Sequence, residues 1–210
     1  MKKWMYALLS IIVLVGIYLY FDYKNQSNVA LVSGDQVSIE KVKRAYKTKL
    51  KSDTPYKEKL YDTSSTLHTK LRVLSKTTAE ALIKEKMLQI QTTGSDNEPM
   101  DSLPSITKEK GIVYLSKDDS VQNIQIENYT VPVTKEKGRV GIGVGKEQET
   151  QEKLLVVDDS IYNDLPLKEN TFSIFRFNIK AVLLHGLPER ADMESNNNVS
   201  ALLLNVNKRK

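Results

Sequence analysis

The sequence predicts an α+β fold in which an N-terminal transmembrane helix is followed by one mixed or antiparallel sheet with two or three helices. Three observations lead to this prediction. An uncharged apolar run occupies residues 4–21, segments with helical spacing lie between residues 38 and 91, and short β-type segments follow residue 105.

The apolar run 4–21 follows two lysines at the N-terminus. As a helix rising about 1.5 Å per residue it would span roughly 27 Å, which is close to the thickness of a bilayer's hydrocarbon core. A cleaved signal peptide is the alternative, but "YLYFDYKNQ" offers no small residues at a cleavage site, and the chain has no cysteine to carry a lipid. We therefore expect residues 1–24 to be a signal-anchor that binds the membrane through residues 4–21, with residues 25–210 as an extracytoplasmic domain.

The first half of the domain predicts one strand and two helices. Residues 28–35 read as a strand, and Ser38 caps a helix that runs to about Lys51. Residues 67–75 fit a helix or a strand, and residues 76–91, "KTTAEALIKEKMLQIQ", show the best helical pattern of the chain. The turn-rich connector 92–105 is a long loop or a seam between two lobes.

The second half predicts mainly strands. The β-type segments are residues 111–116, 123–133, 139–145, 153–158, 171–184 and 199–207. Asn128 could turn the second of these segments into a tight hairpin, and residues 188–197 predict a short helix before the last strand.

Charge and cysteine content narrow the classes of partner and chemistry. Residues 1–24 hold Lys2, Lys3 and Lys24 against Asp22, or +2, which leaves +3 of the total +5 for the domain and does not indicate nucleic acid. The segment Lys41–Lys59 is strongly basic, so it could contact anionic lipid or anionic wall polymer, or could simply be a solvated helix face and a lysine-rich loop. Without cysteine there is no disulfide, thiolate metal site or cysteine nucleophile.

The stretch "LLVVDDSIYNDLP" holds the strongest candidate for chemistry. Asp158 and Asp159 follow a predicted strand, as aspartates do in many Mg²⁺ sites, and Asp118 and Asp119 could be imagined as their partners. The alternative, which we favour, is that Asp159 is the N-cap of a short helix that Pro166 ends. On that interpretation no catalytic, cofactor or metal residue is assigned, with Asp158 and Asp159 as the outside candidates.

Two further motifs do not support a site. The segment "GRVGIGVGK" is not a phosphate-binding loop, because Lys146 is followed by Glu147 and the first required glycine falls on Val140. It reads as a strand with Val140, Ile142 and Val144 toward the core. The two histidines, His68 and His185, have no identifiable partners, and we expect no cofactor.

Several of these stretches resemble known proteins. Residues 76–91, "GIVYLSKDDSVQNIQIENYTVPV", "GIGVG" and "LLVVDDSIYNDLPLKENTFSIFRFN" resemble small uncharacterised extracytoplasmic proteins of Bacillus-type bacteria that are often described as lipoproteins. Residues Val156 to Leu165 are also similar, more distantly, to a strand and short helix of MacB/FtsX-type ABC permease ectodomains. The resemblance covers about residues 76–180. It implies a non-catalytic envelope domain that binds or modulates a partner, and it assigns no functional residue.

The predicted function is that of an uncharacterised, single-pass membrane protein with a non-catalytic binding or accessory domain outside a Gram-positive cell. Its partner would be another envelope protein. Two alternatives remain open: a regulator or subunit of an ABC transporter or secretion system, and an envelope hydrolase that uses Asp158 and Asp159.

Overall fold

The structure, a computed structural model, describes residues 29–62, 70–91, 98–115, 121–143, 153–178, 193 and 199–204. More than half of these residues lie in strands and about a fifth in helices. The helices are α2 (Gln36–Ala45), α3 (Lys76–Lys84) and α4 (Asp159–Asp164). The strands are β1 (Val29–Gly34), β2 (Leu50–Asp62), β3 (Lys70–Ser75), β4 (Leu88–Gln91), β5 (Glu98–Pro99), β6 (Gly111–Leu115), β7 (Asn123–Ile126), β8 (Tyr129–Lys137), β9 (Arg139–Ile142), β10 (Lys153–Val157), β11 (Glu169–Phe177) and β12 (Ser200–Leu204).

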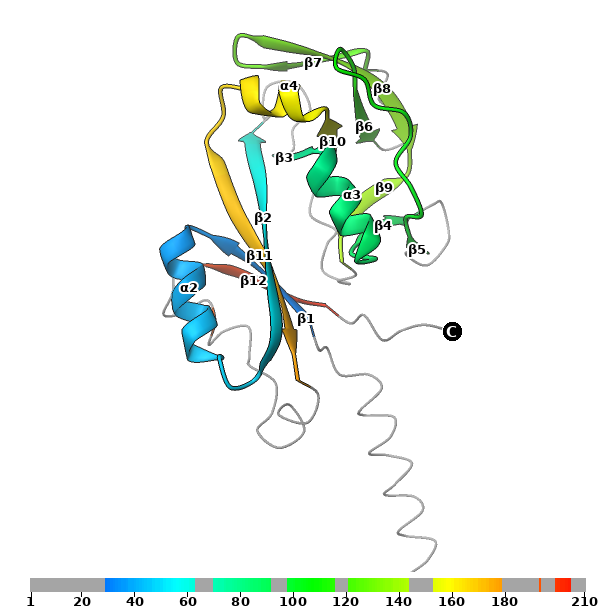
Figure 1. Cartoon of the computed structure of the whole chain (residues 1–210). Coiled ribbons are helices and arrows are strands. Elements are labelled where there is room, and N and C mark those ends of the chain that lie inside the picture. Colours follow the sequence, from blue (N-terminus) through cyan, green and yellow to red (C-terminus); the bar gives the residue numbers. More distant parts are fainter. Residues whose placement is uncertain are drawn as a thin grey trace, which may run out of the picture.

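Nine strands form a mixed sheet in the order β12-β1-β11-β2-β3-β10-β6-β8-β7. Only β3 with β10 and β6 with β8 pair in parallel, and the other neighbours are antiparallel. A second sheet has the order β5-β4-β9. The long strands β2 and β11 run between the part of the sheet beside α2 and the part beside α3 and α4, as Figure 1 shows.

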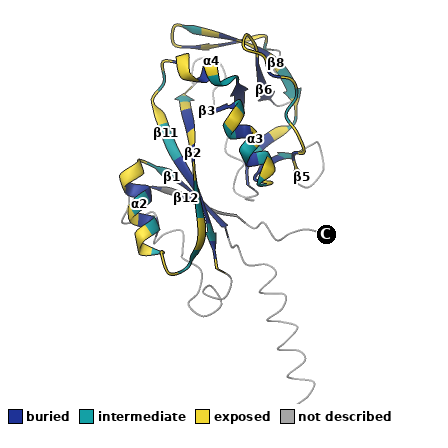
Figure 2. Ribbon diagram, in the orientation of Figure 1, coloured by how far each residue is buried: buried dark blue, intermediate teal, exposed yellow. Residues whose placement is uncertain are grey.

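Three apolar clusters form the core. One lies under α2, one under α4, and the largest joins α3 and the second sheet to the large sheet. Figure 2 shows buried residues along the strands and exposed residues on the outer faces of the helices. Each helix therefore buries one face against the sheet, as an amphipathic sequence requires.

The largest cluster also contains polar contacts that fix α3. The Tyr56 hydroxyl of β2 donates to Glu85 Oε1 at 2.8 Å, and Arg176 of β11 donates to Glu85 Oε2 at 3.2 Å. Glu85 is the C-cap residue of α3, so the end of this helix is fastened to both long strands. Burial, and then the nearby Glu85, raise the pKa of Tyr56.

The predicted fold class, α+β behind a transmembrane helix, is wrong. The protein is mostly sheet, and its strands form two sheets rather than one. No helix in the described ranges is both long and apolar enough to cross a bilayer, while residues 4–21 lie outside those ranges.

Two errors hid the extent of the sheet. The thirteen-residue strand β2 was not predicted because its buried positions include the charged residues Glu58 and Lys59, which break the expected apolar alternation. The predicted helix 76–91 ends at Lys84, and residues 88–91 form β4.

The end of α3 has a specific backbone cause. Lys86 has a φ of 59°, and the amides of Lys86 and Met87 donate to the carbonyls of Ile83 and Leu82, each at 2.8 Å. These two bonds form a Schellman motif, which normally has glycine at the left-handed position. With lysine there, no glycine signals the end of the helix.

The helix predicted from Ser38 to about Lys51 instead has Asp35 as its N-cap and ends at Ala45. Other predicted elements are found close to their predicted places. β1, β6, β9, β10, β11 and β12 all lie within predicted strands or extend beyond them by two residues at most. Within the segment 67–75, the described residues 70–75 form β3. Residues 123–133 belong to the hairpin β7–β8, which turns at Glu127 and Asn128 and whose second strand continues to Lys137. Of the predicted helix 188–197, only Met193 lies within the described residues.

Candidate functional site

The candidate site lies where the parallel strands β3 and β10 end. Ser75, the last residue of β3, pairs with Val157, the last residue of β10. Both strands lead into helices, so α3 and α4 begin at the same edge of the sheet. The carboxyl ends of parallel strands, where polar residues gather, are a common location for ligand sites in sheet proteins.

A local cap begins each of the two helices. Ser75 Oγ accepts the Thr78 amide at 3.1 Å at the start of α3. Asp158 Oδ1 accepts the Ser160 amide at 3.1 Å and the Ser160 hydroxyl at 2.6 Å at the start of α4. The hydrogen bonds from Ser160 hold the pKa of Asp158 below its usual value.

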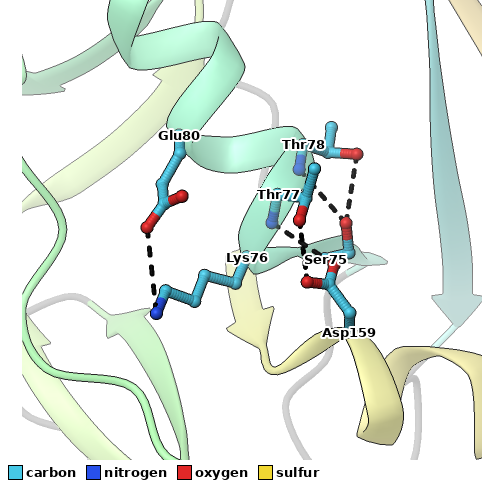
Figure 3. A network of polar contacts seen from close by, with 6 residues as sticks. All are labelled: Ser75, Lys76, Thr77, Thr78, Glu80 and Asp159. Carbon is cyan, nitrogen blue, oxygen red and sulfur yellow. Dashed lines mark hydrogen bonds and ion pairs between the residues drawn. The ribbon is translucent and has the colours of Figure 1, made fainter.

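Asp159 connects α4 to α3. Its carboxylate accepts the Thr77 hydroxyl at 2.7 Å and the Thr77 amide at 3.3 Å, as Figure 3 shows. Thr77 lies in the first turn of α3, where the helix dipole favours a negative charge. The N-cap predicted at Asp159 is therefore formed by Asp158, one residue earlier, and Asp159 stabilises the neighbouring helix instead.

A groove of about 370 Å³ lies beside these caps. One wall is the α3 face with Lys76, Glu80 and Ile83, and the other is the loop 101–106. The ammonium of Lys76 lies 3.9 Å from Glu80 Oε1, a loose ion pair at the surface. The lining combines apolar and charged side chains and has the volume of a small binding site.

Lys59 is the residue that sequence reasoning missed. Its side chain belongs to the predicted basic segment, yet it is only 5% exposed. The ammonium donates to the carbonyls of Tyr162 at 2.6 Å and Leu165 at 2.9 Å, at the C-terminal end of α4, and lies 4.8 Å from the Tyr162 ring centroid. Burial lowers the pKa of Lys59. No local pattern distinguishes it from exposed lysines such as Lys57, because its partners are about a hundred residues away.

The remaining candidates divide into those that the structure describes and those outside it. Val140 and Ile142 are buried, as predicted, and Gly143 ends the described part of that segment. Val144, Lys146, Asp118, Asp119, His68 and His185 all lie outside the described residues. Within the described ranges no three His, Asp or Glu side chains form a group that could hold a metal.

Alanine at position 158 is expected to lower the melting temperature at neutral pH, because the amide of Ser160 loses its acceptor. Since folding lowers the pKa of Asp158, its contribution is present above the usual value of 3.8 and disappears as the pH falls below it. Thermal unfolding of Asp158→Ala and wild type across this range should therefore converge in acid. The matched control is Asn163→Ala in the last turn of α4, an exposed position that provides no cap, so it should not destabilise the helix.

Asp159 and Thr77 are expected to show a coupling free energy of about 1 kcal/mol in a double-mutant cycle with Asp159→Ala and Thr77→Val. Chemical denaturation of the two single variants and the double variant measures this coupling. Additive single effects would mean that the carboxylate does not hold α3.

A comparison with solved structures finds a protein with a similar fold. A crystal structure of a protein from Bacillus anthracis described as a lipoprotein is similar, with a TM-score of 0.65 and 24% identity. The similarity covers 85% of this chain and 98% of that one, and at this identity it concerns the fold. No curated protein matches the chain.

Residues 28–202 match a family described as an uncharacterised lipoprotein family. This description agrees with the resemblance to Bacillus-type lipoproteins, and the distant similarity to ABC permease ectodomains stays a prediction. The family indicates a membrane-anchored, extracytoplasmic protein and gives no role. With the match spanning most of its length, the chain belongs to this uncharacterised lipoprotein family.

Proposed function

We propose that the protein is a membrane-attached, extracytoplasmic binding protein that holds an envelope partner without catalysing a reaction. Membrane attachment is supported by membership of a lipoprotein family, and its assignment to residues 4–21 rests on the apolar sequence of that segment. The non-catalytic role rests on what the Asp158 and Asp159 carboxylates do in the fold. Both carboxylates accept hydrogen bonds from the first turns of helices, so their arrangement is explained by the fold.

The partner would occupy the groove between α3 and the loop 101–106. Its apolar contacts would come from Ile83 and Leu103, and Lys76 and Asp101 would supply one charge of each sign. A short segment of polypeptide fits these features, because its side chains and its backbone amides need apolar and polar contacts together.

Fractionation of cells that express the full chain with a C-terminal tag tests the location. We expect the chain in the membrane fraction, cleaved by protease added to intact cells, and released from the membrane when residues 4–21 are deleted. A full-length chain that stays in the cytosol, or that added protease leaves intact on cells, would contradict the proposal.

Site-specific photocrosslinking in the same cells tests the binding role. A photoreactive residue in place of Ser105 should give one discrete adduct that Ile83→Asp abolishes. The same residue in place of Asn128, in the distant β7–β8 turn, is the matched control and should give none. Hydrolytic turnover of an envelope substrate by the purified chain, lost in Asp158→Ala, would instead support the hydrolase.

A further inference from the structure

The most basic part of the chain is the segment from the second turn of α2 to the start of β2. Residues 41–51 include six Lys or Arg and no acid. Lys43 is paired, at 2.8 Å from Asp53 and 3.5 Å from Glu40. Four others, Lys41, Arg44, Lys47 and Lys51, are exposed and have no ion-pair partner among the described residues. We call Arg44, Lys47 and Lys51 the basic turn.

The buried face of α2 points the other way. Ile39 and Val42 pack into the cluster with Phe175 and Phe177. With 3.6 residues per turn, Lys41 and Arg44 therefore lie on the outer face of α2. The charges are presented to the surroundings, and the fold does not use them in the described structure.

The strand register places the basic turn beside the start of the domain. Val29, the first described residue, pairs with Arg176 of β11, and Arg176 pairs with Ser52 of β2. Neighbouring strands are about 4.8 Å apart, so Val29 and Ser52 are about 10 Å apart across the sheet. Figure 1 shows the start of β1, the end of β11 and the turn from α2 to β2 at the same, lower end of the molecule.

The chain length limits how far this end can be from a membrane. Seven residues, 22–28, separate the apolar run 4–21 from Val29. Even a fully extended segment of this length spans only about 28 Å. When residues 4–21 are attached to a bilayer, the end of the sheet with the basic turn is therefore tethered close to the headgroups, and the β7–β8 turn is at the far end of strands that are tens of ångströms long.

We propose that the basic turn docks the domain onto anionic phospholipid headgroups next to its own anchor. This inference rests on the proposed membrane attachment and adds the orientation of the domain, with the groove of α3 held away from the surface. We favour headgroups over anionic wall polymer because the short tether keeps the basic turn near the membrane surface. Attraction by charged headgroups acts within about 10 Å of that surface. Each basic residue near such a surface strengthens docking about fivefold.

The absence of cysteine allows single labels to be introduced. The full chain with Thr48→Cys is labelled with an environment-sensitive fluorophore and reconstituted into phosphatidylcholine vesicles, with or without phosphatidylglycerol. Thr48 is exposed in the turn after α2. A second chain, labelled through Asn128→Cys in the β7–β8 turn, reports the opposite end. We expect protection of the Thr48 label from an aqueous quencher only with phosphatidylglycerol and at low salt, and no protection of the Asn128 label.

The triple variant Arg44→Gln, Lys47→Gln, Lys51→Gln should lower the docking equilibrium constant on the order of 100-fold. The matched control removes three exposed lysines elsewhere, through Lys108→Gln, Lys110→Gln and Lys137→Gln, and should leave docking unchanged. Flotation with the vesicles reports attachment separately, so a chain that does not float overturns the proposed function. A chain that floats with an unprotected Thr48 label overturns docking alone. Protection by soluble polyglycerol phosphate and not by vesicles would assign the basic turn to wall polymer and would also overturn it.

Discussion

Replacing Arg72 with methionine is expected to lower the free energy of unfolding by about 3–5 kcal/mol. Arg72 of β3 lies with its Nε 3.0 Å from Glu58 Oε2 of β2, and the Glu58 side chain is 1% exposed. The substitution keeps the aliphatic length but removes the cation, so a carboxylate stays buried without its nearest positive charge. Urea denaturation measures the change.

The design includes a control on β2, the strand that carries Glu58. Lys57 pairs with Glu169 at 2.6 Å, but its side chain is 67% exposed, so Lys57→Met should cost less than about 1 kcal/mol. The double variant Glu58→Gln, Arg72→Met should be more stable than Arg72→Met alone, because it leaves no buried carboxylate without its cation. Equal losses for Arg72→Met and Lys57→Met would contradict the role of burial.

Replacing Phe172 with alanine is expected to cost about 3–5 kcal/mol. Phe172 of β11 is fully buried in the largest core cluster, and its ring stacks on that of Tyr56 with centroids 5.4 Å apart. The cost combines the lost apolar burial with the cavity that remains between α3 and the long strands. A lower urea midpoint, with little change in slope, is the expected observation.

Two further variants separate the ring from the polar contact beside it. Tyr56→Phe keeps the ring and removes the hydroxyl that bonds Glu85, so it should cost about 1 kcal/mol. Val37→Ala changes a 67% exposed residue of α2 and should cost almost nothing. A Phe172→Ala variant as stable as Val37→Ala would mean that this cluster does not hold the sheet together.

The sequence predicted most strands, because their buried faces are apolar. After Lys153, β10 is a continuous apolar run, "LLVV", that is buried on both faces, and β6 is similar. β2 was missed for the opposite reason. Its buried Glu58 forms an ion pair with Arg72, its buried Lys59 donates to carbonyls at the end of α4, and neither partner is visible in the local sequence.

The candidate site shows the same division. The aspartates after β10 were assigned to a short helix because Asp followed by Ser and ended by Pro is a local cap pattern. The link from Asp159 to Thr77 depends on the parallel pairing of β3 with β10, which spans about eighty residues. The groove could not be predicted, since the loop 101–106 meets α3 only through tertiary packing.

The central claim is that Asp158 and Asp159 hold helices and do not hold a metal, and the most direct measurement is the melting temperature of the full chain with and without Mg²⁺. A ligand that binds the folded state raises this temperature. We expect the same value in both conditions, with Asp158→Asn, Asp159→Asn equally insensitive to Mg²⁺. A rise with Mg²⁺ in the wild type that is absent in this double variant would contradict the account.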